Sequence, residues 1–347
     1  MGLYKTLRVT GIKKETADCK TFFLATTDGE ELLYQSGQFL TFLFFKRNEE
    51  ERRSYSISSA PVLKEPLSVT IKRVENGEYS RKLTDHTKPG DLLTSIGAGG
   101  FFVLPEDIKQ CQQIFFIAAG SGITPVYSLI KTILYQHPHI KVVLIYSNTS
   151  RQTTIFLDEL DKLSVAFAGR FTIEFLFSGA QNLERARLSK WLLEILLTTY
   201  NKAPWQTTLF YLCGPFDYMR MATIALLENK VPLHNIRKEN FAGLQPEIKT
   251  PPPDIEKHAV EIHIGGKLYS INTQYPQTIL QSAKKSGIKL PYSCEAGRCG
   301  SCAATCSSGS VWMSYNEVLL DEEIEKGKVL TCVGYPVGGD VIIHYDL

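Results

Sequence analysis

The sequence predicts a multidomain α+β protein whose three parts follow one another along the chain. Its first hundred residues consist of short runs rich in aromatic and β-branched residues, which are typical of strands. From about residue 108, apolar strand-like runs alternate with helix-like segments, the pattern of a parallel, doubly wound sheet. The last 90 residues hold five of the eight cysteines. A chain of 347 residues is long enough for two or three domains.

The composition excludes some classes of function. Lys and Arg number 38 against 36 Asp and Glu, a net charge of +2, so nothing favours nucleic-acid binding. No apolar run approaches the roughly 18 residues that a membrane-spanning helix needs. The N-terminus, MGLYKTLRV, lacks the apolar stretch of a secretory signal. We therefore expect a cytoplasmic protein with no membrane-inserted segment and no nucleic-acid partner.

Residues 1–107 are expected to form an antiparallel β-barrel. Five strand-like runs follow one another at short intervals, as in small barrels, and turn-forming pairs such as Asn76-Gly77 and Pro89-Gly90 interrupt the chain. The runs are 3–12, 20–27, 37–45, 52–59 and 67–74.

Residues 108–243 are expected to form a doubly wound α/β domain. Its strands are continuous apolar runs, which suits burial on both faces of a parallel sheet, and a helix-like segment follows each one. The strand-like runs are 113–120, 140–147, 171–178 and 208–214, and the helix-like runs are 125–137, 155–167, 188–200 and 217–230.

A linker and a third unit complete the chain. Residues 244–256 show no core pattern, and three consecutive prolines at 251–253 stiffen this linker. Residues 257–347 begin with a predicted hairpin that turns at Gly265-Gly266.

Four cysteines of the third unit have the spacing of iron–sulfur ligands. Cys294, Cys299 and Cys302 form a C-x4-C-x2-C motif, and Cys332 follows 30 residues later, as in plant-type 2Fe–2S sites. Small residues between them allow the backbone to wrap closely and to direct N–H groups at sulfur. The alternative, a zinc site, usually pairs two short cysteine knuckles, and only one is present. Cys306 falls outside the spacing and is expected to be a core thiol.

With this motif identified, the chain resembles two known families in succession. The last 90 residues resemble a plant-type ferredoxin domain, which has a β-grasp fold. The preceding part resembles the ferredoxin-NADP reductase family in four segments: RRSYSISSA (52–60), AAGSGITPV (118–126), YLCGPF (211–216) and ENFAG (239–243). The resemblance implies a flavin on the barrel and a nicotinamide nucleotide on the α/β domain.

The resemblance assigns the centre of the flavin site to RRSYSISSA. Arg53 matches the residue that binds the flavin pyrophosphate, a pairing that suits a guanidinium. Tyr55 matches the ring that stacks on the isoalloxazine. Ser56 matches the hydroxyl that hydrogen-bonds flavin N5.

Two further segments of the barrel resemble flavin-binding elements. In GEYSRKL, Gly77 and Ser80 are expected before a helix whose N-terminus lies under the flavin phosphates. Lys72 lies in a strand expected to line the flavin ring. This segment favours FAD, although phthalate dioxygenase reductases share the domain order and use FMN.

The glycine-rich turn after the first strand of the α/β domain is expected to bind NADPH. Gly120 and Gly122 permit close approach of the backbone to a phosphate, and Pro125 suits a first helical turn. The resemblance assigns nicotinamide binding to Gly120, Gly122, Thr124, Pro125, Gly214 and Pro215.

The choice between NADPH and NADH depends on the segment after the second sheet strand. NAD-binding domains often place an acidic residue there for the ribose, but none occurs before Asp158. Ser147 and Arg151 suit a 2′-phosphate, which favours NADPH, whereas a solvent-facing Arg151 would leave NADH possible.

Three residues are given catalytic roles by the resemblance. Cys213 is expected where the nicotinamide packs, and Glu239 is expected to close over the flavin together with the cofactor-binding Phe241. Ser56, at flavin N5, completes the catalytic set.

The order of the domains resembles reductase components of bacterial oxygenases, in particular the phenylacetyl-CoA oxygenase reductase group. It implies that electrons pass from NADPH to FAD, to the 2Fe–2S cluster and then to an external acceptor protein, an oxygenase component. Two alternatives stay open. One is a reductase for another acceptor, such as a nitric-oxide or hybrid-cluster system, and the other is a redox sensor with the same cofactors.

Overall fold

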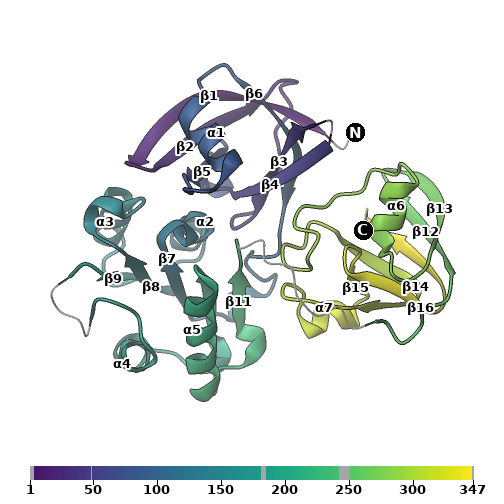
Figure 1. The fold of residues 1–347 in the computed structure, drawn as a ribbon. Coiled ribbons are helices and arrows are strands. Elements are labelled where there is room, and N and C mark those ends of the chain that lie inside the picture. The colour runs from purple at the N-terminus through teal and green to yellow at the C-terminus, as the bar shows by residue number, and fades with distance from the viewer. Residues whose placement is uncertain (1–3, 48, 181–184, 242–250, 346–347) are drawn as a thin grey trace.

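The computed structural model describes residues 4–47, 49–180, 185–241 and 251–345, so residues 244–250 of the expected linker lie outside the described residues. The chain forms three units, each built on its own sheet (Figure 1). The first sheet is antiparallel, the second is parallel and the third is mixed. The predicted multidomain architecture is confirmed.

The first unit is a six-stranded antiparallel barrel. Its strands are β1 (Lys5–Thr16), β2 (Cys19–Thr26), β3 (Phe39–Lys46), β4 (Glu49–Ser56), β5 (Ser68–Lys72) and β6 (Leu92–Gly99), in the order β4-β3-β6-β1-β2-β5. Alternate residues face inward: Leu7 and Val9 are buried, whereas Arg8 between them is exposed. The sheet closes where Ile57 bridges Val69, which brings the end of β4 beside β5. Helix α1 (Glu78–His86) follows β5.

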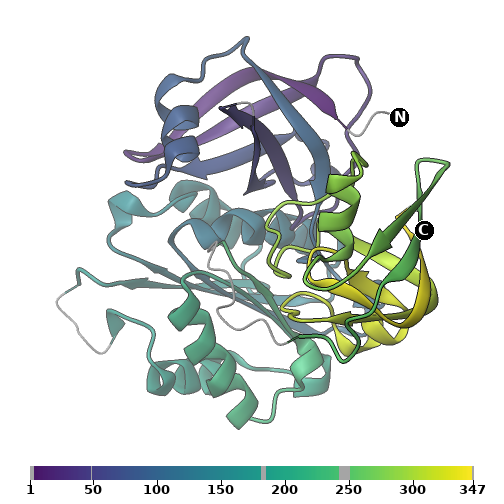
Figure 2. The same cartoon turned by 45° about the vertical axis from the view of Figure 1, so that its right-hand side comes forward.

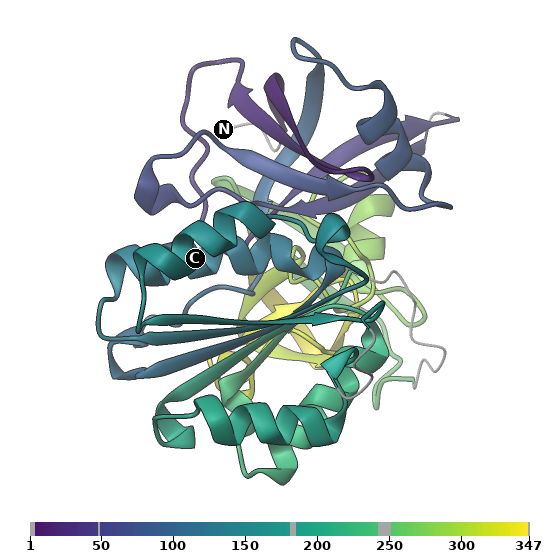
Figure 3. The same ribbon diagram turned by 90° about the vertical axis from the view of Figure 1, so that its left-hand side faces the viewer.

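The second unit is a parallel sheet covered by helices on both faces (Figure 3). Its elements are β7 (Gln113–Ala119), α2 (Ile123–Gln136), β8 (Lys141–Asn148), α3 (Leu157–Ala166), β9 (Phe171–Phe177), α4 (Lys190–Tyr200), β10 (Thr208–Cys213), α5 (Phe216–Glu228) and β11 (Ile236–Glu239). Helices α2 and α3 pack on one face, and α4 and α5 pack on the other. Ile114, Phe115 and Phe116 of the central strand β7 are fully buried, which explains its continuous apolar run.

Strand β11 is a fifth strand that no sequence pattern predicted. Its four residues, IRKE, contain no apolar run, and two of them are buried. The strand pairs with β10 at the edge of the sheet, so Glu239 lies opposite Cys213. The sheet order is β11-β10-β7-β8-β9.

The third unit is a mixed sheet with one helix packed against it. Its elements are β12 (His258–Ile264), β13 (Lys267–Thr273), α6 (Ile279–Lys285), β14 (Ala303–Met313), α7 (Asp321–Glu325), β15 (Lys328–Leu330) and β16 (Gly334–His344). The predicted hairpin joins β12 to β13, and Gly265 and Gly266 adopt positive φ at its turn. Strands β12 and β16 pair in parallel, whereas the other pairs are antiparallel.

The barrel contacts both other units. On one side, the Ser128 hydroxyl of α2 donates to the Ser59 carbonyl at 2.6 Å, and Lys131 of the same helix pairs with Glu65. On another side, the third unit lies beside the barrel (Figure 2). Among the helices of the described residues, none has the length and apolar character needed to cross a membrane.

Candidate active site and cluster-binding loop

Strands β4 and β5 and the start of α1 enclose a cavity of about 560 Å³, here called the flavin cavity. Ser121 and Thr124 from the glycine-rich turn and Phe241 complete its wall. A guanidinium, several hydroxyls, an aromatic ring and a helix N-terminus are groups that suit the pyrophosphate and ring of a flavin. The lining includes every residue expected to bind the flavin: Arg53, Tyr55, Ser56, Lys72, Gly77 and Ser80.

Arg53 and Tyr55 occupy different environments in this cavity. The Arg53 guanidinium lies 4.8 Å from the centre of the Tyr79 ring and donates to Glu51 at 2.9 Å. Its side chain is half exposed, so the charge is accessible to a ligand. Burial raises the pKa of Tyr55, which keeps the phenol neutral.

The Ser80 hydroxyl stabilises the turn before α1 through two hydrogen bonds. This hydroxyl accepts from the Val74 N–H and donates to the Gly77 carbonyl, both at 3.1 Å. A Cβ atom at Gly77 would lie 2.5 Å from the Ser80 oxygen. Ser80 therefore shapes the turn, and the N–H groups of the first helical turn are the donors available to a phosphate.

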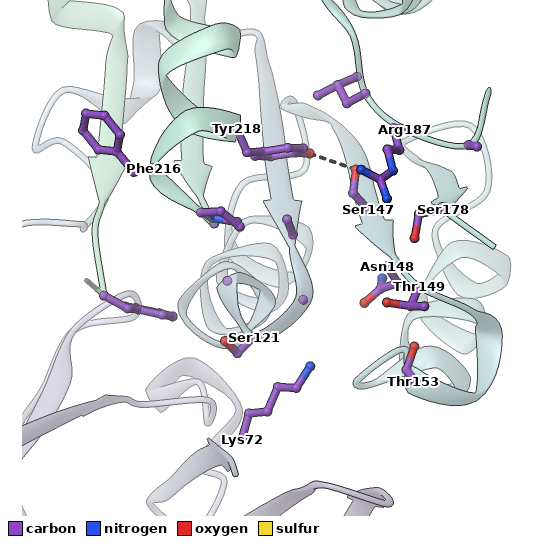
Figure 4. Close-up of a pocket in the computed structure, with 18 of the residues that line it drawn as sticks. Lys72, Ser121, Ser147, Asn148, Thr149, Thr153, Ser178, Arg187, Phe216 and Tyr218 are labelled. Carbon is purple, nitrogen blue, oxygen red and sulfur yellow. Dashed lines mark hydrogen bonds between the residues drawn. The ribbon is translucent and has the colours of Figure 1, made fainter. Parts of the chain in front are cut away.

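A second cavity, of about 640 Å³ and here called the nucleotide cavity, lies at the carboxyl ends of β7, β8 and β10 (Figure 4). Ligands of doubly wound sheets bind at this edge. A Cβ atom at Gly122 would lie 2.0 Å from the Cys213 carbonyl oxygen, so the turn requires glycine there. Expected ligands in the lining are Gly120, Gly122, Ser147, Gly214, Pro215 and Phe241.

Two other expected nucleotide ligands lie in the first turn of α2. Thr124 and Pro125 are buried, and the Thr124 hydroxyl donates to the Ser121 carbonyl at 2.9 Å. Thr124 lines the flavin cavity rather than the nucleotide cavity. Thr124 therefore supports the glycine-rich turn through this hydrogen bond, and Pro125 lies beside it in the helix.

The arginine in the nucleotide cavity is Arg187, not Arg151. Arg151 begins the 3-10 helix η4 (Arg151–Thr153), is absent from the cavity lining, and pairs with Asp161 at 3.3 Å on the surface. Arg187 precedes α4, lines the cavity and points toward Ser147 (Figure 4). A lone arginine in a loop has no spacing signal, so no sequence pattern identified Arg187.

Tyr218 is a second lining residue that sequence motifs missed. Its hydroxyl lies 3.1 Å from the Ser147 hydroxyl and donates to the Ala118 carbonyl at 3.2 Å. Tyr218, near the start of α5, therefore contacts residues of β7 and β8, and its side chain lines the nucleotide cavity. The only sequence signal is its position three residues after the CGP motif.

The three expected catalytic residues meet at the ends of strands from two units. The Ser56 hydroxyl donates to Glu239 Oε2 at 3.3 Å, and Glu239 is the strand partner of Cys213. All three residues are buried. Burial raises the pKa of Glu239 to about 8, against the opposing effect of the Ser56 hydrogen bond. Burial, and then the charge of Glu239, also raise the pKa of Cys213, which keeps it a neutral thiol.

A third cavity, of about 450 Å³ and here called the junction cavity, connects this group to the third unit. Ser56, Glu239 and Phe241 line one side of it, and Cys294 and Cys299 line the other. Phe241 also lines both other cavities. The residue expected at flavin N5 and two expected cluster ligands therefore share one space.

The four expected cluster ligands contact one another. Cys294 is hydrogen-bonded by Cys299, by Cys332 and by the Ala296 N–H, the last at 3.4 Å, and these contacts lower the pKa of Cys294. The same thiol contacts raise the pKa of Cys299 and Cys332, and Cys332 also contacts Cys302. Backbone N–H groups directed at sulfur suit an iron–sulfur cluster.

The loop that carries these ligands depends on two glycines. Gly297 and Gly300 adopt φ of +71° and +73°, and a Cβ atom at Gly297 would lie 2.8 Å from the Tyr315 carbonyl oxygen. Cys306 lies apart on β14 and donates to the Ser308 carbonyl at 3.2 Å. Within the described residues, no three His, Cys, Asp or Glu side chains surround a point that could hold a single metal ion. A 2Fe–2S cluster distributes its thiolates over two iron ions.

These features define the class of protein, an NAD(P)H-dependent flavin and iron–sulfur oxidoreductase. Three family models match the chain in the order of the units: an oxidoreductase FAD-binding domain over residues 6–103, an oxidoreductase NAD-binding domain over 116–223 and a 2Fe–2S iron-sulfur cluster binding domain over 262–337. The cofactors are FAD, NAD(P)H and a 2Fe–2S cluster.

Relatives are similar over the whole chain. The ferredoxin reductase component of a 3-ketosteroid-9-alpha-monooxygenase from Rhodococcus rhodochrous is 32% identical, with 98% of this chain and 96% of the relative covered. One component of the 1,2-phenylacetyl-CoA epoxidase from Escherichia coli is 28% identical, with 100% and 99% covered. The chain belongs to the family of three-domain reductases in which these oxygenase components fall.

A solved structure shows the same fold. Phthalate dioxygenase reductase superimposes with a TM-score of 0.61 at 21% identity, with 98% of both chains covered. The likeness therefore extends over all three units.

Proposed function

We propose that this chain is the reductase component of an oxygenase system, which takes electrons from NADPH and delivers them singly to a separate oxygenase protein. The observation that carries the proposal is the junction cavity, because Ser56 and Glu239 face Cys294 and Cys299 across it. The relatives from Rhodococcus rhodochrous and Escherichia coli, a monooxygenase reductase component and an epoxidase component, support this assignment.

The residues of the flavin cavity hold and orient the flavin in this proposal. FAD, when bound, supplies the ability to take up two electrons together and release them one at a time, which matches a one-electron cluster. Arg53, with Gly77 and the first turn of α1, binds the diphosphate. Tyr55 stacks on the ring, and Lys72 lines it. Thr70, buried in the wall of the cavity, helps to exclude water.

Ser56 and Glu239 form a hydrogen-bonded pair at the edge of the flavin cavity. Below a pH of about 8 Glu239 is protonated, and its Oε2 lies 3.3 Å from the Ser56 oxygen. With a flavin bound, Ser56 would hydrogen-bond the ring nitrogen that receives the hydride of NADPH, and Glu239 would hold Ser56 in that orientation through their hydrogen bond. Cys213 remains a neutral thiol that packs against the nicotinamide.

NADPH is the preferred nucleotide in this proposal, with NADH a weaker substrate. Gly120, Gly122, Gly214 and Pro215 shape the nucleotide cavity, and Thr124, beside Pro125, supports the turn. Arg187 and Ser147 bind the 2′-phosphate, a role that Arg151 could share only by leaving Asp161. The four ligands of the 2Fe–2S cluster are Cys294, Cys299, Cys302 and Cys332.

The domain limits proposed from the sequence are 1–107, 108–243 and 257–347, with a linker at 244–256. The three family matches lie within these limits, which supports them. A cytoplasmic location is proposed because none of the eight cysteines forms a disulfide bond, and the cytosol keeps thiols reduced.

Reconstitution with oxygenases tests the acceptor. The purified chain, NADPH and the oxygenase component of a ketosteroid monooxygenase, a glycine betaine monooxygenase or a phenylacetyl-CoA epoxidase are combined, and oxygenated product is measured against NADPH consumed. One product per NADPH with one of these oxygenases supports the proposal. Rapid one-electron reduction of cytochrome c, with no product from any of the three, would point to another acceptor. Cytochrome c reduction much slower than the reduction of the flavin by NADPH would favour a sensor.

A further inference from the structure

We propose that Arg52 and Ser54 of β4 fix the cluster-binding loop against the flavin-binding strand, and that they are positioning residues for the passage of an electron from flavin to cluster. The two contacts, Arg52 with Tyr292 and Ser54 with Ser293, are here called the β4 clamp. This inference rests on the proposed path of electrons within the chain, but not on the identity of the external acceptor.

Arg52 forms the first half of the β4 clamp. Its Nη1 donates to the Tyr292 carbonyl at 2.8 Å, and its guanidinium carbon lies 3.5 Å from the centre of the Tyr292 ring. The Arg52 side chain is only 3% exposed, and Tyr292 is also buried. Tyr292 lies two residues before the ligand Cys294, so a buried charge on the barrel holds the start of the cluster-binding loop.

The charge of Arg52 is balanced from its own strand. Its Nε donates to Glu50 Oε1 at 2.7 Å, and the Tyr4 hydroxyl donates to the other oxygen of Glu50 at 3.1 Å. Lys289 of the third unit lies 4.9 Å from the centre of the Tyr4 ring. A buried charge is tolerated only when it is paired in this way. Glu50 therefore holds the Arg52 guanidinium in the position from which it contacts Tyr292.

Ser54 forms the second half. Its hydroxyl lies 2.6 Å from the Ser293 hydroxyl and 2.8 Å from the buried Thr41 hydroxyl. Ser54 directly precedes Tyr55 of the flavin cavity, and Ser293 directly precedes Cys294. The β4 clamp therefore joins the neighbour of a flavin-binding residue to the neighbour of a cluster ligand.

The opposite side of the loop also packs on the barrel. A Cβ atom at Gly300 would lie 2.4 Å from the Phe101 ring, so the loop and the ring are in close contact. Ser301 lies beside Gly99, at the end of β6. The cluster-binding loop is thus held from two sides, and the β4 clamp is the polar side.

A clamp is needed because domains in one chain move relative to each other unless an interface holds them. The rate of electron transfer between two centres falls as the distance between them grows, so a contact that fixes the cluster-binding loop also sustains this rate. The β4 clamp offers directional contacts to two consecutive residues of the loop: a buried, charge-assisted one from Arg52 to Tyr292 and a neutral hydroxyl contact from Ser54 to Ser293.

The test compares three variants of the holoprotein: Arg52→Ala, Arg52→Lys and Ser54→Ala. After rapid mixing with NADPH, flavin reduction and cluster reduction are followed separately by absorbance. We expect Arg52→Ala to slow cluster reduction severalfold while flavin reduction and the KM for NADPH stay near wild type. Arg52→Lys should restore part of the rate, because it keeps the charge without the planar stack. Ser54→Ala should slow it less than Arg52→Ala does.

Hydrogen–deuterium exchange gives a second readout that does not depend on activity. Peptides covering residues 290–301 should exchange faster in oxidised Arg52→Ala than in wild type. The matched control is Arg170→Ala, since Arg170 also donates to backbone carbonyls, those of Leu134 and His137, and faces a ring, that of Phe167. This control should change neither cluster reduction nor exchange of the loop.

The inference requires that Arg52→Ala show both slower cluster reduction and faster exchange of the cluster-binding loop. The inference is wrong if Arg52→Ala, with full FAD and iron content, reduces its cluster at the wild-type rate. It is also wrong if flavin reduction and cluster reduction slow equally, or if the loop exchanges no faster than in wild type. If Arg52→Ala loses its cluster, Ser54→Ala decides by the same two measurements. Failure of any oxygenase to accept electrons would overturn the proposed acceptor and leave these results unaffected.

Discussion

The Ser56 hydroxyl donates a hydrogen bond of 3.3 Å to the Glu239 carboxylate, across 183 residues of sequence. Ser56 ends β4 of the barrel, and Glu239 ends β11 of the parallel sheet. Ser56 lines the flavin and junction cavities, and Glu239 lines the junction cavity, so the bond joins these two spaces. A change at either residue should consequently affect more than one cofactor site.

The pH dependence of stability should report Glu239. Its pKa is about 8 in the folded protein, against an ordinary value of 4.5, so it retains a proton that the unfolded chain loses above that value. Stability therefore falls as the pH rises from about 4.5 to 8, by roughly 1.4 kcal/mol per pH unit at most. Glu239→Gln removes this loss. The melting temperature of the variant apoprotein, relative to wild type, should rise steadily between pH 5 and pH 8, and a constant difference would contradict the assignment.

Discrimination between NADPH and NADH should depend on Arg187. A charge-assisted contact with the 2′-phosphate contributes about 1.5–3 kcal/mol, or roughly 10- to 150-fold in affinity. Arg187→Ala should raise the KM for NADPH by that factor and leave the KM for NADH nearly unchanged. Arg151→Ala is the control, because Arg151 pairs with Asp161 outside the cavity lining. A larger effect from Arg151→Ala in steady-state kinetics would restore Arg151 as the phosphate ligand.

Loss of one cluster ligand should separate the two halves of the electron path. Cys332→Ser removes a thiolate bonded to iron, so cluster absorbance and cytochrome c reduction should collapse. FAD content and NADPH-dependent ferricyanide reduction should persist, since the flavin and nucleotide cavities contain no described residue of the third unit. Cys306→Ser is the matched control and should keep its iron. Normal cytochrome c reduction by Cys332→Ser would remove the cluster from the path.

The glycine-rich turn should not tolerate a methyl group. In Gly122→Ala, the new Cβ would start 2.0 Å from the Cys213 carbonyl, and relief requires movement of the backbone. Overpacking of this kind costs about 1–3 kcal/mol, so we expect a lower melting temperature and weaker NADPH binding. Gly11→Ala, whose Cβ would meet Phe23 at an ordinary 3.5 Å, is the control for the substitution. Equal behaviour of the two variants in calorimetric NADPH titration would refute the steric argument.

Local patterns were enough to predict the fold class, and with the family resemblance they selected residues that the fold brings together around one cavity and in one loop. Continuous apolar strands such as β7 indicated a doubly wound sheet, because both faces of its central strand are buried. Cys294, Cys299 and Cys302 were identified because their spacing is a property of one loop. Arg53, Tyr55 and Ser56 lie close together on one strand and line a single cavity with Ser80.

Only the tertiary structure decided which distant residues meet. Nothing in the sequence relates Arg52 to Tyr292, which lies 240 residues away, or distinguishes Arg187 from Arg151. Strand β11 escaped prediction for the same reason, since pairing with β10 rather than its own composition makes IRKE a strand. Short-range spacing is encoded by backbone geometry and burial, which act within an element. Contacts between loops of different units depend on how whole sheets pack, and no local pattern records that packing.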